Sequence, residues 1–357
     1  MKVTFVLPGA SPMPAGGPRM VFRYANALAR SNWGVTVMMP QELEVSSGLR
    51  SLVNRGRFWR WKLRGDWSPA GWMPMDPRVR LSWVPNLDPR RAPAGDAVVA
   101  TAVQTAEAVT AWPAVAGRKF YFVQGYETWD FPAERVEASW RLPLRKIAVS
   151  RWLCELIAAA GTRADYVPNG LDHDGFGLDR EPEDRDPASL VWPYHPGPLK
   201  GSADVLAALP ALLKAAPALR IRAFGTAKPP THWPVPVGYI RNPAQAVLRE
   251  LYNASTMAVA PSHSEGWGLP ACEALQCGCA LAASDVGGHR EFLRDDGNAL
   301  LHRPGDVGAL TDNLLRLLRD PTLRLRLARQ GVADMAKLAF PPSVEKLKTV
   351  LQETEMT

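Results

Sequence analysis

Short runs of apolar and β-branched residues alternate with helix-sized segments along most of this chain. Such runs are typical of buried strands, and their regular alternation with helices predicts parallel sheets that helices cover on both faces. The segment after the first run has apolar residues at helical spacing, with Met20, Val21, Tyr24 and Leu28 on one face. In the N-terminal half we predict strands at residues 2–8, 34–39, 97–101, 119–123 and 147–149.

The same alternation restarts in the C-terminal half, where we predict strands at residues 189–194, 219–224, 257–260 and 280–283. A chain of 357 residues exceeds the length of about 150 residues that is typical of one domain. Doubly wound domains bind ligands at the carboxyl ends of their strands, and two that face each other would share a central cleft. We therefore predict an α/β fold with Rossmann-like domains at 1–168 and 188–338, an interdomain linker at 169–187, and a C-terminal helix within 339–357 that packs back on the first domain.

Cysteine usage and the length of the hydrophobic runs indicate a cytoplasmic protein. Four cysteines occur without paired CxxC spacing, so core thiols are expected rather than a disulfide framework or a zinc site. The first apolar run is too short for a signal peptide, and no run reaches the roughly 20 apolar residues that span a bilayer. The net charge of +7 favours an anionic partner, for which nucleic acid, lipid headgroups and nucleotide diphosphates all qualify.

The segment at residues 261–278 (PSHSEGWGLPACEALQCG) contains the most informative candidate functional residues. A strand is expected to end before it, a glycine-rich turn follows, and a helix begins near Leu269. Glu265 precedes that helix and Glu273 lies in its first turns, so the two carboxylates could accept hydrogen bonds from two different hydroxyl-bearing groups. The glycines of the turn would let backbone amides approach a phosphate at the helix N-terminus. A surface loop followed by one solvated helical glutamate is the plain structural alternative.

This pattern, PS-x-x-EG-x-G-x-P-x-x-E-A-x-x-x-G, resembles the signature of family 4 glycosyltransferases. Four further segments also match the family. They are a PNG-x-D segment at 168–172 with Phe176 after it, the pair Lys200-Gly201, a GG-x-x-E turn at 287–291, and an N-terminal diglycine, Gly16-Gly17. The resemblance covers nearly the whole chain and is more specific in the C-terminal half.

The resemblance implies the GT-B fold, with the acceptor on the N-terminal domain and the nucleotide-sugar donor on the C-terminal domain. It also implies a retaining reaction without metal, in which Glu273 holds the ribose, Glu265 the donor sugar and Lys200 the leaving diphosphate. The phosphate oxygen itself would take the acceptor proton, and cations and aimed amides would stabilise the charge that develops there. The other donor-binding residues that it implies are Gly16, Gly17, Gly266, Trp267, Gly268 and Leu269, with Ile240 and Arg241 near the nucleobase.

Two positions depart from the family pattern. Members usually have an arginine five residues before the lysine, and this chain has His195 there. A histidine can be positive, but its ordinary pKa of about 6.5 does not require it, so a phosphate contact and a packing role are both open. Where many members have a sugar-facing histidine, this chain reads QGYE, which resembles the QDYE segment of rhamnosyltransferase-like members. Gln124, Tyr126 and Glu127 are therefore candidates for the sugar or acceptor side, with a capped strand-to-helix loop as the alternative.

Two DxD sequences formally match the metal-binding motif of the other glycosyltransferase fold. Asp172-His173-Asp174 overlaps the PNG-x-D segment, and Asp184-Arg185-Asp186 lies in the expected linker. Neither follows a predicted strand, although carboxylate oxygens are suitable ligands for hard cations. We predict no metal site and no cofactor, the nucleoside diphosphate sugar being a co-substrate.

A basic aromatic stretch spans residues 50–67 (RSLVNRGRFWRWKLRGDW) and contains one acid, Asp66. Cations interleaved with tryptophan are typical of interfacial membrane contacts, and the same composition can grip nucleic acid through phosphates and stacking. We expect membrane contact through Arg57, Trp59, Arg60 and Trp61. An ordinary surface with buried tryptophans is the alternative, and nucleic acid is disfavoured because no RNA-binding motif accompanies the stretch.

The function predicted from these features is retaining transfer of a sugar from a nucleoside diphosphate sugar to a hydroxyl of a glycan or lipid-linked acceptor. The expected setting is assembly of a cell-surface polysaccharide or glycolipid, by a cytoplasmic enzyme that binds peripherally to the inner face of the plasma membrane. One alternative is a nucleotide-sugar epimerase or hydrolase of the same architecture. Another is a non-catalytic nucleotide-binding subunit, which would be expected to lack Lys200 or the two glutamates.

Overall fold

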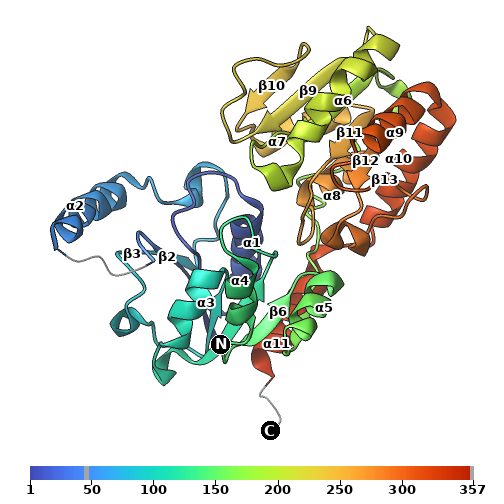
Figure 1. Cartoon of the computed structure of the whole chain (residues 1–357). Coiled ribbons are helices and arrows are strands. Elements are labelled where there is room, and N and C mark those ends of the chain that lie inside the picture. Colours follow the sequence, from blue (N-terminus) through green and yellow to red (C-terminus); the bar gives the residue numbers. More distant parts are fainter. Residues whose placement is uncertain (44–47, 354–357) are drawn as a thin grey trace. The chain divides into compact units, whose positions relative to one another are not determined.

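The computed structural model of the chain describes residues 1–43 and 48–353, without the side chains of 48–52 and 55. The chain divides into two compact units (Figure 1). The first consists of Met1–Pro168 together with Pro341–Thr357, and the second of Asn169–Phe340. The chain therefore passes between the units twice, after Pro168 and after Phe340.

A seven-stranded sheet forms the middle of the first unit, and all its paired strands are parallel. Its order is β3-β2-β1-β4-β5-β6-β7, so the direction in which the sheet grows reverses between β1 and β4. The interior strands are almost wholly apolar and buried, as expected for a sheet covered on both faces. The strands are β1 (Lys2–Val6), β2 (Gly34–Pro40), β3 (Val79–Val84), β4 (Ala97–Ala100), β5 (Arg118–Val123), β6 (Arg145–Ala148) and β7 (Ala164–Tyr166).

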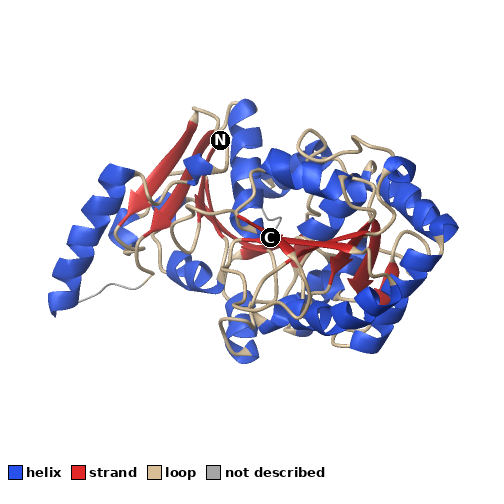
Figure 2. Cartoon of the chain, turned by 90° about the horizontal axis from the view of Figure 1, so that it is seen from above, coloured by secondary structure: helices blue, strands red, loops and turns tan. Residues whose placement is uncertain are grey.

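Helices flank this sheet (Figure 2). The helix after the first strand has its predicted apolar face, because Met20, Val21, Tyr24 and Leu28 are all buried. The last helix also belongs here, since Arg118 donates to the carbonyl of Leu351 at its end. The helices are α1 (Gly16–Arg30), α2 (Gly48–Arg64), α3 (Val103–Thr110), α4 (Ala133–Trp140), α5 (Arg151–Ala159) and α11 (Phe340–Gln352).

The second unit repeats this plan with a six-stranded parallel sheet in the order β10-β9-β8-β11-β12-β13. Here the order reverses between β8 and β11. The strands are β8 (Ser189–Pro193), β9 (Arg220–Gly225), β10 (Gly238–Arg241), β11 (Met257–Ala260), β12 (Ala280–Ser284) and β13 (Leu300–His302). The helices are α6 (Ser202–Ala215), α7 (Gln245–Asn253), α8 (Leu269–Gln276), α9 (Val307–Arg319) and α10 (Pro321–Met335).

The prediction of helix-covered parallel sheets is confirmed, but the list of strands was incomplete. It lacked β3, β7, β10 and β13, which are the edge strands of the two sheets. The segment Ile240-Arg241, expected to follow a strand, itself lies in β10. Edge strands have a neighbour on one side only, and three of these four carry half-buried or exposed residues at most positions. They therefore lack the continuous apolar run that marks an interior strand.

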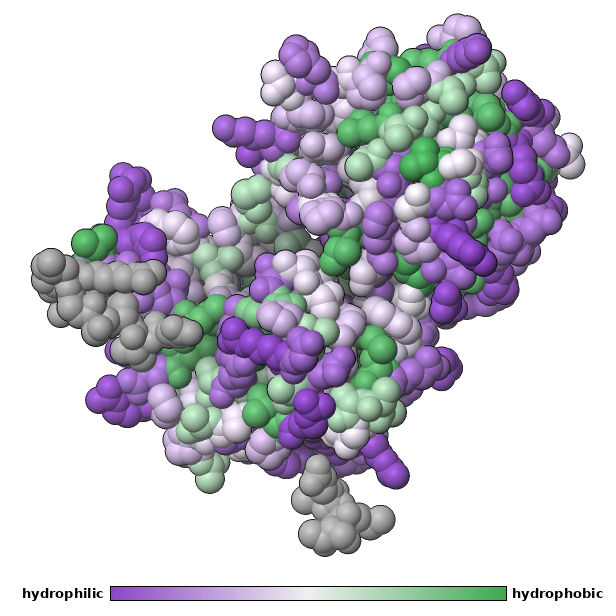
Figure 3. Space-filling model, viewed as in Figure 1, coloured by the Kyte–Doolittle hydropathy of each residue, from purple (hydrophilic) through white to green (hydrophobic). Residues whose placement is uncertain are grey.

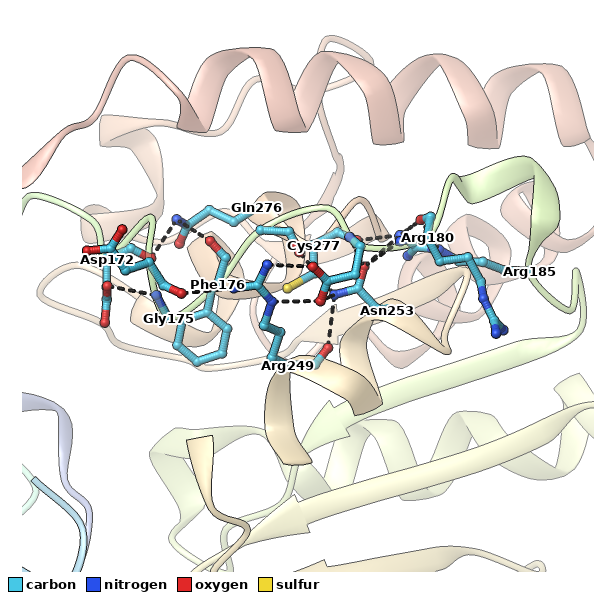
Figure 4. Close-up of polar contacts among 12 residues, drawn as sticks. Asp172, Gly175, Phe176, Arg180, Arg185, Arg249, Asn253, Gln276 and Cys277 are labelled. Carbon is cyan, nitrogen blue, oxygen red and sulfur yellow. Dashed lines mark hydrogen bonds and ion pairs between the residues drawn. The ribbon is translucent and has the colours of Figure 1, made fainter. Parts of the chain in front are cut away.

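Residues 169–187, which the sequence analysis assigns to a linker, are grouped with the second unit. Figure 4 shows how polar contacts hold this segment against α7 and α8. The side-chain oxygen of Asn253 accepts from the amide of Asp179 at 2.8 Å, and the amide of Gln276 donates to the carbonyl of Asp172 at 3.1 Å. Arg249 forms an ion pair with Asp179. Asp172 and Asp179 of this segment thus have specific partners on α7 and α8.

Arg185 is the most buried cation of this segment, with 4% of its surface exposed. Its guanidinium donates to backbone carbonyls rather than to a carboxylate. The acceptors lie at 3.1 Å (Arg180), 3.3 Å (Tyr252), 3.0 Å (Ser255) and 2.6 Å (Cys277). One side chain therefore satisfies the carbonyls that end α7 and α8 and ties them to the incoming segment.

We predict that Arg185→Ala lowers the free energy of unfolding by about 3 kcal/mol, because it leaves several buried carbonyls without a donor. Urea unfolding followed by circular dichroism measures the change. Arg180→Ala is the matched control, since that side chain is exposed in the same segment, and it should change stability by less than about 0.5 kcal/mol. Equal stability of the two variants would show that the carbonyls are satisfied in another way.

Candidate functional site

The candidate site lies where the strand order of the second sheet reverses. In doubly wound sheets the loops that leave two strands at such a point diverge to opposite faces and open a crevice at the carboxyl edge. Here the loop from β8 to α6 carries His195 and Lys200, and the loop from β11 to α8 carries Glu265. Residues 65 positions apart in sequence are thereby brought to one edge of the sheet.

The two loops are in close backbone contact. Gly201 has a φ of 62°, and a Cβ there would lie 1.9 Å from the carbonyl oxygen of Pro261, so only glycine fits. The amide of His263 donates to the carbonyl of Leu199 at 2.8 Å. Its ring Nε2 lies 2.6 Å from a carboxylate oxygen of Asp204, in the first turn of α6. These contacts fix the position of one loop relative to the other.

Lys200 and Glu265 form an ion pair at this junction. The ammonium of Lys200 lies 2.8 Å from Oε1 of Glu265, and the hydroxyl of Ser262 donates to the same oxygen at 2.8 Å. Burial alone would raise the pKa of Glu265, but the charge and hydrogen bond of Lys200, with smaller contributions from His289 and Ser262, lower it below its ordinary value. Glu265 is therefore ionised at neutral pH. The Lys200 side chain remains 42% exposed, so an anionic ligand can reach it.

His195 follows β8 and is exposed. Its Nδ1 accepts a hydrogen bond from the amide of Gly197 at 2.9 Å, and its own amide donates to the hydroxyl of Ser202 at 3.0 Å. Partial burial, and then the charge of Lys200, lower the pKa of His195. The ring is therefore neutral at pH 7, with its proton on Nε2, and it can donate a hydrogen bond without carrying a full charge.

The glycine-rich turn before α8 rests on the segment 287–291, which forms a short 3-10 helix. The amide of Gly288 donates to the carbonyl of Glu265 at 2.9 Å, and a Cβ at Gly288 would lie 2.4 Å from the amide nitrogen of Trp267. A glycine is thus needed at position 288 so that the two turns can pack together. The side chain of Trp267 is buried against Phe292, which leaves its backbone as the part that can meet a ligand.

His289 packs against the glycine-rich turn before α8. Its ring is buried, and its Nδ1 lies 2.8 Å from the carbonyl of Ser284, to which it donates. Burial lowers the pKa of His289, so the ring is neutral, and it packs against Gly268 at the N-terminus of α8. Because the ring of His289 is neutral, the cationic features of the site are the positive end of the α8 dipole and the charge of Lys200.

The second carboxylate, Glu273, lies in the middle of α8, as predicted, and α8 begins at Leu269. It is 5% exposed. A carboxylate is rarely buried to this extent unless a hydrogen bond or an opposite charge compensates the loss of hydration. The structure thus places Glu273 in the second turn of α8, inside the unit rather than on its solvent face, while Glu265 lies in the loop before that helix.

The predicted residues of the first unit divide into two kinds. Gln124, after β5, lies beside the diglycine that opens α1, because a Cβ at Gly17 would be 3.4 Å from its amide nitrogen. Tyr126 instead donates to Glu137 at 2.8 Å, and burial raises its pKa to about 12. Glu127 is buried and accepts hydrogen bonds from two neighbours.

Those bonds assign Glu127 to the framework of the loop. The amide of Val103 donates to Glu127 at 3.3 Å at the start of α3, and the hydroxyl of Tyr121 donates at 3.2 Å. Burial raises the pKa of Glu127 to about 7, against which these two hydrogen bonds act. Both features fit the capped loop that the sequence analysis kept as the alternative reading.

The remaining predicted positions lie elsewhere. Ile240 and Arg241 belong to the edge strand β10, two strands from β8, and Arg241 donates to the carbonyl of Thr226 at 3.1 Å. Arg57, Trp59, Arg60 and Trp61 lie on α2 of the first unit. Within residues 1–43 and 48–353, no helix is long and apolar enough to cross a membrane, and no three His, Cys, Asp or Glu side chains are grouped as metal ligands would be.

Four residues of the site were missed at the sequence level: Asp204, Ser262, His263 and His289. Ser262 and His263 lie within the glycosyltransferase-like motif, and Asp204 is in the first turn of a predicted helix. Their pattern alone does not distinguish them from loop residues, and the partner of Asp204 and His263 is in each case distant in sequence. The parallel pairing of β8 with β11 supplies the missing information.

Known proteins match this chain in sequence over part of its length. Residues 239–333 match the family model described as glycosyl transferases group 1. A D-inositol 3-phosphate glycosyltransferase of Segniliparus rotundus is 28% identical over 226 residues, which is 55% of this chain and 48% of that protein. The enzyme of the same name from Frankia alni is 44% identical over 92 residues, 26% of this chain and 23% of that protein. The chain thus spans less than half the length of these curated relatives.

Solved structures match over nearly the whole chain. Sucrose-phosphate synthase from Thermosynechococcus elongatus superimposes with a TM-score of 0.75 at 14% identity, covering 98% of both chains. HepE from Anabaena, solved with UDP-glucose, gives a TM-score of 0.74 at 14% identity, covering 98% of this chain and 99% of that one. The chain therefore has the GT-B fold, and its second unit carries the sequence pattern of group 1 glycosyl transferases.

Proposed function

We propose that this protein is a retaining glycosyltransferase that moves a sugar from a nucleoside diphosphate sugar to a hydroxyl acceptor. The observation that carries the proposal is the Lys200–Glu265 pair at the sheet reversal of the second unit, beside the N-termini of α6 and α8. The match of residues 239–333 to group 1 glycosyl transferases, which includes both glutamates, supports it. The acceptor that we propose belongs to a cell-surface polysaccharide or glycolipid assembled on the cytoplasmic side of the membrane.

The diphosphate would be held by the N-terminus of a helix and by the side chain of Lys200. The first turn of α8 contains no acidic side chain, and the one acid in the first turn of α6, Asp204, is engaged with His263. The N-terminus of α8 therefore keeps the positive potential that favours a phosphate. Lys200 adds a full charge, and the Nε2 proton of His195 adds a neutral donor in the place where relatives have an arginine.

Lys200 and Glu265 must exchange partners when a donor binds. The phosphate oxygens compete with Glu265 for Lys200, and Glu265 in turn becomes free to accept hydrogen bonds from hydroxyls of the sugar. Before the exchange Glu265 is ionised, because the Lys200 charge holds its pKa below the ordinary value. The ion pair thus keeps the carboxylate and the ammonium in position until a donor binds.

In the transfer itself the bond between the anomeric carbon and the phosphate oxygen breaks as the acceptor oxygen bonds to the same face of that carbon. The acceptor proton goes to the departing phosphate oxygen. Lys200 and the amides of residues 266–269 stabilise the negative charge that grows on the diphosphate. Glu273 would hold the ribose, and Ile240 and Arg241 would lie near the nucleobase.

Replacing the cation tests the diphosphate site. We predict that Lys200→Ala lowers kcat roughly a hundredfold or more, the scale on which removal of a positioned charge stabiliser acts. Lys214→Ala is the matched control, because Lys214 is an exposed lysine in the last turn of α6, the helix that follows Lys200, and it should retain wild-type kcat. The donor is UDP-glucose, or a sugar conjugate of whichever nucleotide raises the Tm most among UDP, GDP and dTDP. The rate is measured as the release of nucleoside diphosphate from that donor. Full activity of Lys200→Ala would place the diphosphate elsewhere.

The two glutamates should differ in what they affect. Glu273→Ala is expected to weaken nucleoside diphosphate binding, whereas Glu265→Ala should mainly lower kcat because it acts on the reacting sugar. Isothermal titration with the nucleotide and steady-state kinetics separate the two effects. Because Glu265→Ala also frees Lys200, we expect this variant to bind nucleotide at least as tightly as the wild type. Unchanged affinity and unchanged rate in both variants would contradict the assignment.

Removal of metal ions tests the charge stabilisation. We predict that activity persists in excess EDTA, since Lys200 and the N-terminus of α8 would take the role that a metal has in other transferases. The control is an assay in which the same EDTA is saturated with Mg²⁺. Loss of activity with EDTA that Mn²⁺ or Mg²⁺ restores would count against this mechanism.

A further inference from the structure

Aromatic residues on one side of the helix α2 attach it to the first unit. Phe58 and Trp61 stack on Trp83 of the edge strand β3, with ring centroids 6.0 and 5.9 Å away and planes inclined by 4° and 19°. The indole of Trp83 also donates to the carbonyl of Phe58 at 3.4 Å. This side of α2 therefore faces the sheet, and two of the helix's aromatic residues serve to dock it.

The side of α2 that faces away from Trp83 exposes large apolar residues. Val53 is 72% exposed, Trp59 55% and Leu63 84%. At 100° per residue, these three positions fall within about a third of the helix circumference. Three of the seven exposed large hydrophobic residues in the described part of the chain lie on this one helix, whereas exposed apolar residues are ordinarily scattered.

Cations surround these apolar side chains. Arg57, Arg60, Lys62 and Arg64 are all exposed, and the sequence of α2 contains no acid. Among the residues that the structure describes, none of the four forms an ion pair with a carboxylate. In Figure 3 the surface over α2 is strongly hydrophilic, with an apolar residue among the charged ones.

Lys62 shows how closely charge and apolar surface are mixed on this helix. Its ammonium lies 5.0 Å from the ring centroid of Trp59 and 5.6 Å from that of Phe58. The exposed aromatic ring is therefore already in contact with a cation. Such a pair suits the headgroup region of a bilayer, where an anionic phosphate and an apolar boundary lie within a few ångströms of each other.

We propose that the outer face of α2, defined by Val53, Arg57, Trp59, Arg60 and Leu63, binds the surface of an anionic lipid bilayer. The cations would approach lipid phosphates while Trp59 and Leu63 enter the boundary between headgroups and acyl chains. Exposed Val53 and Leu63 favour lipid over nucleic acid, because aliphatic side chains do not stack on bases as aromatic ones do. The inference does not depend on the proposed transfer reaction, since binding is measured without donor or acceptor.

Sedimentation of the full-length protein with vesicles tests the proposal. The vesicles contain phosphatidylcholine alone or with roughly one third phosphatidylglycerol, which supplies the anionic surface. We expect binding to the anionic vesicles and little to the neutral ones, with a partition coefficient that falls as salt rises. At high salt a weaker component should remain, because apolar insertion is not screened.

Two pairs of substitutions separate these components. Arg57→Glu with Arg60→Glu should lower the low-salt partition coefficient at least about a hundredfold, since each cation contributes about fivefold and here is reversed in sign. Trp59→Ser with Leu63→Ser should abolish the high-salt component and retain part of the low-salt one. The matched control is Arg316→Glu with Arg319→Glu, the same charge change at the same spacing on α9, where both residues are exposed.

All substituted residues are exposed, so each variant should unfold at the wild-type Tm, which differential scanning calorimetry checks. The proposal is overturned if the wild type ignores anionic vesicles at low salt, or if it binds neutral ones equally well. It is also overturned if the α9 control lowers binding as much as the α2 pair, which would mean a non-specific effect of net charge. Displacement from vesicles by single-stranded RNA, together with RNA binding that Arg57→Glu with Arg60→Glu abolishes, would assign α2 to nucleic acid instead.

Discussion

The second unit depends on the contact between the backbone of Gly201 and the carbonyl of Pro261. A side chain at position 201 would collide with that carbonyl, so the loops that follow β8 and β11 could not both keep their paths. This contact places Lys200 against Glu265 and lets His263 reach Leu199 and Asp204. The positions of the charged groups thus follow from the packing of these two loops, which in turn depends on the parallel pairing of β8 with β11.

The strands that sequence reasoning found and missed differ in one physical respect. Interior strands such as β1, β4 and β11 are buried on both faces, so their sequences are continuous apolar runs that predict a strand directly. The missed strands are all at sheet edges. β10 contains no buried residue and β7 has only half-buried ones, so their assignment rests on hydrogen bonds to a neighbour rather than on residue type. Local sequence does not encode that neighbour.

Sequence reasoning named residues of the candidate site but not the contacts between them. The motif around Glu265 and the Lys200-Gly201 pair could be identified because both resemble segments of a known family. Their direct ion pair could not, since only the sheet order brings them together. The state of His195 also needed the structure, because the Gly197 amide that binds Nδ1 determines which ring nitrogen carries the proton.

Composition indicated the basic aromatic stretch, but the docking side of α2 decides which of its residues can meet a partner. Trp61 looks equivalent to Trp59 in sequence, yet it stacks on Trp83 while Trp59 is more than half exposed. Whether a cation can meet a partner also depends on what it already contacts in the structure. In the second unit Arg185 and Arg249 are taken up by carbonyls and by Asp179, whereas α2 has no acid of its own to neutralise its cations. A net charge of +7 therefore matters less than where the unpaired cations lie beside exposed apolar side chains, since only there can electrostatic attraction and burial act on the same partner.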